Sequence, residues 1–310
     1  MAVILNEFET SSEGTAHNGE DDNVSWEQYL KRRNLVLQFL HSDLNLSHLQ
    51  HYRNKVELLK KCCFYLEIEP KHVNVTDHNH EMHHIDILEV IDPIQWERMK
   101  KVGKKQTEIQ LSLLTELLEQ LERGREELSC CIETCDMVSL LSGWDMIMQR
   151  LSKLSKFMET LLPLQVPGKL YVKRRLVSQA DLASILPAIK LSLCTKTPLI
   201  FDRRESFAYK DRVKLKWFSE NQESFLEPCQ LHIKLLTNGN QAELGYGRLQ
   251  PVSSNTCIVQ DLQPGRSYEF TIRRSRTRTF VFADWHDSIT LKTKPDAVED
   301  ADSSAWAPEG

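Results

Sequence analysis

The segment 262–272 constrains the fold of this chain more than any other stretch of the sequence. It reads Leu-Gln-Pro-Gly-Arg-Ser-Tyr-Glu-Phe-Thr-Ile. Pro264 fixes the backbone φ angle and Gly265 permits a positive φ, so we expect the chain to turn sharply there. Every second residue from Tyr268 onward is apolar, which is the pattern of a strand with one buried face. A tyrosine at the start of such a strand can bond back to the upstream backbone and hold the corner.

Short runs of alternating apolar residues precede and follow this corner. They cover 213–217, 231–235, 257–259 and 289–291, and the sequence Asn-Gly-Asn at 238–240 marks a turn between two of them. Regularly spaced short strands of this kind are typical of an antiparallel β-sandwich. We therefore expect a seven-stranded sandwich over residues 196–295.

Three of these features together resemble a fibronectin type III domain. They are Trp217 at the end of the second strand, the corner from Leu262 to Tyr268, and Leu291-Lys-Thr-Lys-Pro295 at the close. The resemblance implies an immunoglobulin-like sandwich with a core built on Trp217, Leu262, Tyr268 and Phe270. With the region in front of it, the whole chain resembles a family of fibronectin type III domain-containing proteins. The loop between the last two strands has no Arg-Gly-Asp triplet, so an integrin-type adhesive function has no support.

Residues 25–190 are predicted to form an antiparallel helical bundle, so the fold class is multidomain with α and β parts. The Ser-Trp-Glu-Gln sequence at 25–28 is a capping-box pattern, and Asp-Pro at 92–93 is a second strong helix start. Apolar residues spaced by three and four predict a helix over 47–69. Residues 71–91 are interpreted as a long connection with room for one short strand or helix.

The helix after residue 93 is the longest one predicted. Its apolar positions keep the spacing of three and four, and Gly124 fills one core position. A further helix is expected from about 144 to 162. The apolar seam is interpreted as the core of an intramolecular bundle, and self-association through a coiled coil is the alternative that remains open. Residues 1–24 and 296–310 are polar and acidic and are expected to be disordered.

Composition and charge argue against two classes of partner. The chain has 310 residues and a formal net charge of −5, whereas nucleic-acid-binding proteins usually carry a basic surplus. No apolar run approaches the roughly 20 residues needed to span a bilayer. We therefore expect no nucleic-acid and no membrane partner, and a cytoplasmic location in which the eight cysteines stay reduced.

One pattern indicates a competing, enzymatic function. The stretch His-Glu-Met-His-His at 80–84 matches H-E-x-x-H, in which two histidines on one helix face hold zinc and the glutamate is the general base. A looser metal site would draw on His78, His80, His83 or His84 with Asp77 or Asp86. The surrounding segment is polar and no further ligand motif follows. We interpret it as a solvated connection, and a metal-dependent hydrolase using His80, Glu81 and His84 is the alternative.

Cys131 and Cys135 lie one helical turn apart and could bind a metal or form a redox pair. Both fall on the apolar seam of the long helix, where a cysteine behaves as a small hydrophobic residue. No second cysteine pair with metal-site spacing accompanies them. We therefore interpret these cysteines as structural, and assign no catalytic residue, metal ligand or cofactor.

The loop before the last strand is the candidate contact surface. It combines arginines with aromatic residues, which are enriched at protein interfaces. These residues are Arg274, Arg276, Arg278, Phe280 and Trp285. The alternative is a solvated loop with Trp285 folded back on the sandwich. The basic run at 173–175 is a weaker candidate.

We expect a non-catalytic interaction or scaffold protein whose partners are other proteins. Helical arms followed by a fibronectin type III domain resemble cytoskeleton-associated proteins, which implies a cytoskeletal or ciliary partner and location. The acidic surface of tubulin would complement the basic loop.

Overall fold

The computed structural model describes residues 20–76, 82–164, 169–170, 176–177, 188–219, 228–236 and 247–295. Its helices are α2 (Glu20–Ser42), α3 (Leu46–Lys61), α4 (Ile87–Val90), α5 (Pro93–Thr134), α6 (Met137–Ser142) and α7 (Trp144–Leu164). Its strands are β1 (Cys63–Glu69), β2 (His72–Thr76), β3 (Met82–Asp86), β4 (Lys169–Leu170), β5 (Lys190–Lys196), β6 (Leu199–Phe201), β7 (Phe207–Ala208), β8 (Val213–Ser219), β9 (Cys229–Leu236), β10 (Arg248–Val252), β11 (Thr256–Val259), β12 (Ser267–Arg274), β13 (Phe280–Phe282) and β14 (Ser288–Lys292). The predictions for 1–19, 173–175, 238–240 and 296–310 lie outside the described residues.

The chain divides into two compact units, and each unit consists of two stretches of sequence. The helical unit comprises Met1–Asn54 and Ser112–Gln165. The mixed unit comprises Lys55–Leu111 and Val166–Gly310. Helices α3 and α5 therefore contribute residues to both units.

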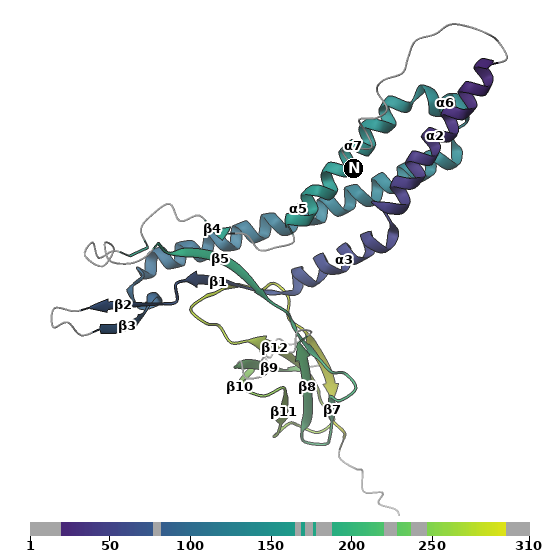
Figure 1. Cartoon of the computed structure of the whole chain (residues 1–310). Helices are drawn as coiled ribbons and strands as arrows, with labels where there is room; N and C mark the ends of the chain where they lie inside the picture. Colours follow the sequence, from purple (N-terminus) through teal and green to yellow (C-terminus); the bar gives the residue numbers. More distant parts are fainter. Residues whose placement is uncertain are drawn as a thin grey trace, which may run out of the picture. The chain divides into compact units, whose positions relative to one another are not determined.

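The helical unit is built from α2, α6, α7 and the adjoining parts of α3 and α5 (Figure 1). Its core is aliphatic and keeps the helical spacing. The core residues of α5 and α7 are Leu114, Leu118, Leu121, Leu128, Ile132, Ile147, Leu151, Leu154 and Leu161. A Cβ atom on Gly124 would lie 2.4 Å from Leu154 Cδ2, so α5 and α7 approach closely at this glycine. The prediction that Gly124 occupies a core position is thereby confirmed.

The first part of the mixed unit is a four-stranded sheet in the order β13-β1-β5-β4. Strand β1 pairs antiparallel with β5 along its whole length and with β13 on its other side. Its first four residues are all buried. Helix α5 contacts this sheet at Gly103, where an added Cβ atom would lie 3.2 Å from Leu193 and 3.5 Å from Leu66.

Three sequence-based predictions for residues 20–91 differ from the structure. Helix α3 ends at Lys61 and β1 follows, because Cys-Cys-Phe-Tyr-Leu at 62–66 is a nearly continuous apolar run, the pattern of a strand buried on both faces. Residues 72–76 and 82–86 pair as the strands β2 and β3, and residues 87–90 form the short helix α4, which is capped by the Asp86 carboxylate. Helix α2 begins at Glu20 rather than at residue 25. The region 25–190, which was predicted to be helical, therefore also contains β-strands.

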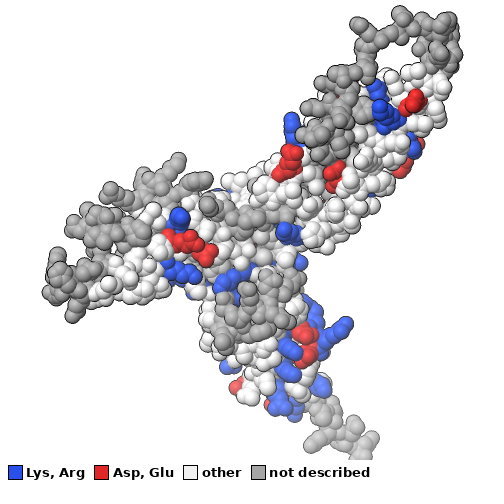
Figure 2. Space-filling view, viewed as in Figure 1, with Lys and Arg blue, Asp and Glu red and all other residues white. Residues whose placement is uncertain are grey.

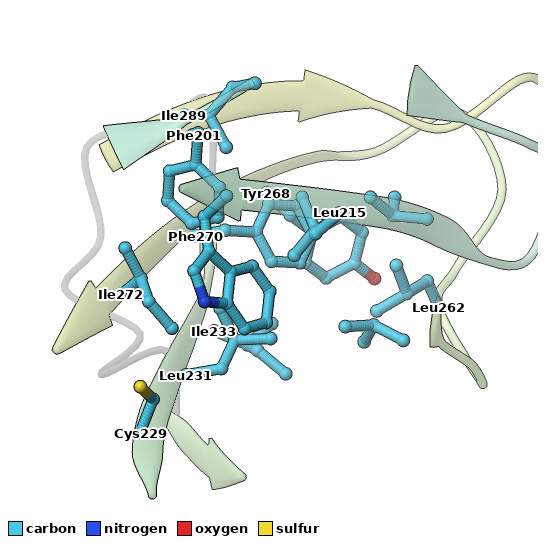
Figure 3. Close-up of a cluster of buried hydrophobic side chains, with 13 residues drawn as sticks. Phe201, Leu215, Cys229, Leu231, Ile233, Leu262, Tyr268, Phe270, Ile272 and Ile289 are labelled. Carbon is cyan, nitrogen blue, oxygen red and sulfur yellow. The ribbon is translucent and has the colours of Figure 1, made fainter. Parts of the chain in front are cut away.

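The second part of the mixed unit is the predicted two-layer sandwich. One layer has the strand order β10-β9-β12-β14, and the other has β11-β8-β6, with β7 also paired to β8. Strands β6 and β7 pair with successive parts of β8, so the first strand of the sandwich is divided in two. The predicted core residues Trp217, Leu262, Tyr268 and Phe270 are all buried in its single apolar cluster (Figure 3).

The corner before β12 has the expected geometry. Gly265 has a φ angle of 66°, which requires a residue without a Cβ for an unstrained turn. The backbone N–H of Gln263 donates a hydrogen bond of 2.8 Å to the hydroxyl of Tyr268. Figure 3 shows this hydroxyl directed toward the side of the core where Leu262 lies. The corner is thus fixed by a side chain that is itself anchored in the core.

Candidate functional site: a basic cleft in the mixed unit

The loop predicted to be a contact surface is the stretch between β12 and β14, and the structure uses its middle as a strand. In β13, Phe282 pairs with Phe64 of β1, and Phe280 pairs with Tyr65. The rings of Phe282 and Phe64 are stacked with centroids 5.0 Å apart, and both side chains are buried. The backbone N–H of Leu66 also donates to the carbonyl oxygen of Thr279, at 2.8 Å. The β12–β14 loop of the sandwich therefore forms one edge of the four-stranded sheet β13-β1-β5-β4.

All five predicted contact residues contact other residues of the chain: Phe280 pairs with Tyr65 as described above, and Arg276 lies over Phe280. Arg274 donates to the carbonyl oxygen of Thr197 at 3.0 Å, and Arg278 donates to that of Leu88 at 2.8 Å. The Trp285 ring lies 5.4 Å from Nζ of Lys61, in a cation–π contact. Their side chains therefore help to hold the loop in place, which sequence reasoning had weighed only for Trp285.

The remaining predicted residues, Arg276 and Phe280, line a cleft of about 780 Å³. The Arg276 guanidinium is exposed and lies over the ring of Phe280, 5.8 Å from its centroid. Arg274 also reaches this cleft. Sequence reasoning thus identified one wall of a concave surface.

A second wall of the cleft is the outer face of the sandwich layer β10-β9-β12-β14. Arg273 on β12 lies opposite Gln230 on β9, and both line the cleft together with His232. An added Cβ atom on Gly247 would lie 2.5 Å from Nε2 of His232, so the backbone packs closely against this imidazole. The polar wall is therefore built on paired strands.

The third wall is the first part of α5. Glu97, Lys100, Lys101 and Lys104 follow the spacing of one helix face and all line the cleft. Lys100 forms an ion pair with Glu97, and Nζ of Lys104 lies 5.6 Å from the centroid of the Phe282 ring. Lys101 is exposed. Lysines on α5 thus face arginines of the sandwich across the same cleft.

The electrostatic balance of the cleft is strongly positive. Six Lys and Arg side chains line it against two carboxylates, Glu97 and Asp284, in a chain whose formal net charge is −5. Lys and Arg also outnumber Asp and Glu on the visible face of the sandwich in Figure 2. Burial holds the pKa of the half-buried His286 below its ordinary value, and the charges of Arg273 and Arg276 lower that pKa further. The imidazole is therefore neutral at pH 7, inside a positive field.

Several of these residues could not be identified from the sequence as parts of a site. The α5 lysines read as a solvated helix face, because charged runs on helices usually are. Arg273, His232 and His286 belong to no motif. The available signal was the helical spacing of Lys100, Lys101 and Lys104, which places three cations on one side of the helix.

His84 does not have the helical geometry that the H-E-x-x-H zinc motif requires. This histidine lies in β3, where it stacks on His72 at 4.6 Å and its Nδ1 lies 2.9 Å from Oδ1 of Asn74. The zinc motif needs both histidines on one face of a helix, so the hydrolase alternative loses its structural premise. His80 and Glu81 lie outside the described residues. Within the described ranges, no three His, Cys, Asp or Glu side chains are arranged to hold a metal ion.

The Cys131 and Cys135 thiols lie close together, with their Sγ atoms 3.6 Å apart. Burial raises the pKa of Cys131 to about 11, and the neighbouring Cys135 adds to the shift. A thiol with such a pKa stays protonated at pH 7 and is a poor nucleophile or metal ligand. The geometry therefore favours the structural interpretation of this pair.

Two family models match the chain. The one described as "Family of unknown function (DUF5581) N-terminal domain" matches residues 22–191, and the one described as "Family of unknown function (DUF5581) Fn3-like domain" matches residues 196–300. The chain is also similar to two curated proteins called fibronectin type III domain-containing protein 11, from Bos taurus and Homo sapiens. Each is 42% identical over 275 residues, which covers 89% of this chain and 82% or 86% of the relative.

The chain is also similar to solved fibronectin type III domains. The fibronectin type-III domain of human fibronectin type III domain containing protein 3 shares 12% identity with a TM-score of 0.25, and covers 34% of this chain and 93% of that one. The assignment of the sandwich rests on its own strand order, core and tyrosine corner. Among the helices in the described part of the chain, none is long and apolar enough to cross a membrane.

Proposed function

The chain belongs to the family of fibronectin type III domain-containing protein 11, and on that premise we propose that it is a non-catalytic interaction module that binds an acidic segment of a partner protein in the basic cleft. The observation that carries this proposal is the arrangement of cations on facing walls, Lys100, Lys101 and Lys104 on α5 against Arg273 and Arg276 on the sandwich. Like charges held across a cleft repel one another, so an anionic occupant lowers the energy of the arrangement.

The size and the lining of the cleft indicate the class of partner. A volume of about 780 Å³ holds several residues of an extended peptide, and its walls include the apolar side chains of Phe280 and Leu249. A segment with acidic side chains and an occasional apolar one fits such a surface. We propose the acidic tails of tubulin as the first partner to test, and with them a cytoskeletal or ciliary location.

Microtubule co-sedimentation of the full-length chain tests this proposal. Arg274 and Arg278 bond to backbone carbonyl groups, so reversing their charges would report on folding. Lys101 and Arg276 are exposed and line the cleft. We expect the double variant K101E/R276E to lose about tenfold in affinity or more, which corresponds to about 1.4 kcal/mol.

Lys105 is the matched control. It lies on the same helix, is exposed, pairs with Glu108 and does not line the cleft. K105E should bind as the wild type does at equal ionic strength, apart from a small uniform effect of net charge. Microtubules from which the acidic tails have been cleaved should not bind. Equal binding by K101E/R276E and wild type would refute the cleft as the binding surface.

A further inference from the structure

The walls of the cleft include a group of nitrogen donors from β12 and from the loop that follows it. Arg273 is fixed in β12, opposite Gln230, and Arg276 lies over the Phe280 ring. His286 lies within the field of both guanidinium groups, which lower its pKa, while Asp284 acts in the opposite direction. Two guanidinium groups and one imidazole therefore act on the same part of the cleft.

The other charged groups that face this part do not neutralise it. From α5, Lys100, Lys101 and Lys104 line the same cleft, and the carboxylate of Glu97 is already paired with Lys100. His232 lines it from β9. A dianion offsets this surplus better than a single carboxylate does, because its Coulomb energy with each cation is about twice as large.

The donors also suit the shape of a phosphoryl group. Guanidinium groups present planar forks of N–H donors that match the oxygens of phosphate, and their bonds to it are charge-assisted. A protonated imidazole adds a further donor. The volume of the cleft greatly exceeds that of a free ion, so the residues on either side of the modified side chain would lie along the α5 wall.

We propose that Arg273, Arg276 and His286 form a subsite for the phosphoryl group of a phosphorylated serine or threonine in the acidic partner segment. The proposal rests on the proposed function and adds a regulation to it, since phosphorylation of the partner would strengthen binding. A phosphoryl dianion stabilises the imidazolium form of His286, so binding is coupled to proton uptake by this side chain.

The sign of the pH dependence follows from that coupling. The free protein carries a neutral His286 at pH 7, because its pKa is lowered. The bound dianion raises this pKa, so affinity for the phosphorylated segment increases as the pH falls through the His286 pKa of the complex. Below about pH 6 the phosphoryl group itself takes up a proton and the gain is lost.

The experiment compares two peptides of one acidic sequence, one with serine and one with phosphoserine at its centre. Their affinities for the full-length chain are measured by calorimetry at 150 mM salt, and the imidazole signal of His286 is followed by NMR. We expect the phosphorylated peptide to bind at least tenfold more tightly, and the pKa of His286 to rise when it is bound. Replacing the phosphoserine by glutamate should restore only a small part of the difference.

Three variants separate the subsite from the rest of the cleft. R276Q should remove the preference for phosphoserine while retaining most of the affinity for the serine peptide. K101Q, on the α5 wall, should weaken both peptides by a similar factor and keep the preference. K105Q, outside the cleft, should change neither affinity.

Each contrary outcome has one meaning. Equal affinity for the two peptides, or an unchanged His286 pKa, overturns the subsite while binding of acidic segments stands. Failure of both peptides to bind overturns the proposed function as well. Binding of anionic lipid vesicles in place of either peptide would assign the cleft to a membrane surface and overturn both proposals.

Discussion

Tyr268 shows how one side chain fixes a loop of the sandwich. Its ring lies in the apolar cluster, and its hydroxyl accepts the backbone N–H of Gln263 across the Pro-Gly turn. We expect Y268F to lower the free energy of unfolding by about 1 kcal/mol, because the ring still fits and only the hydrogen bond is lost. Chemical denaturation of the full-length chain measures the change.

Tyr209 provides the control for this substitution. It is 38% exposed, and its ring contacts Arg212 and Phe207, contacts that phenylalanine would keep. Y209F should therefore change stability by less than about 0.5 kcal/mol. A loss in Y268F no larger than that in Y209F would show that the hydroxyl does not hold the corner.

At the scale of elements, Gly124 decides how closely α5 and α7 pack. Alanine has a higher helix propensity than glycine by about 1 kcal/mol, so G124A would stabilise an exposed helix. Here the added methyl group would lie 2.4 Å from Cδ2 of Leu154, whose side chain is fully buried. Overpacking costs about 1–3 kcal/mol, so we expect G124A to destabilise the protein by about 1 kcal/mol or more.

A double-mutant cycle tests the physical cause. L154A alone removes the opposing side chain and should cost about 2–5 kcal/mol. In that background the close contact with Leu154 is absent, so the second substitution should become neutral or stabilising. If G124A destabilises both backgrounds equally, the close contact with Leu154 is not the reason for the glycine.

The same elements show which parts of the fold a single sequence reveals. Caps and corners are local: the helix start at Asp92 and the turn at Gly265 follow from residues within a few positions, and both occur in the structure. Strand β1 was missed because its apolar residues continued the spacing of the helix before it. Pairing of β1 with β13 joins residues that are far apart in the chain, and nothing local specifies a non-local partner.

The candidate site follows the same rule. Arg274, Arg276 and Phe280 were found because arginines and aromatic residues alternate within one loop. The lysines of α5 were not identified, because a basic helix face indicates a binding site only when a second basic surface lies opposite it in the folded protein. The charge of a cleft is a property of the assembled unit, and the sequence of any one of its walls does not contain it.

At the scale of the molecule, the division into units does not follow the order of the chain. The mixed unit needs both Lys55–Leu111 and Val166–Gly310, because the β12–β14 loop supplies an edge strand and two carbonyl acceptors to the earlier stretch. Trp96 Nε1–H donates to the carbonyl oxygen of Arg278, and the backbone N–H of Leu66 to that of Thr279. One loop therefore links the sandwich to the first sheet, and the same loop supplies part of the lining of the cleft.

Phe282 is the buried side chain of this loop that packs on β1, in a cluster with Cys62 and Phe64. We expect F282A to remove the stacked contact with Phe64 at a cost of about 3 kcal/mol. Hydrogen exchange at the Leu66 amide and the Trp96 indole should accelerate by roughly 100-fold, because both donate to the loop, whereas the β12 amides should stay protected.

The control is F207A, at an aromatic residue that is 40% exposed, and it should leave both probes unchanged. Unaltered exchange in F282A would mean that the loop is held by other contacts, whereas loss of protection throughout β12 would mean that the sandwich cannot fold without this pairing.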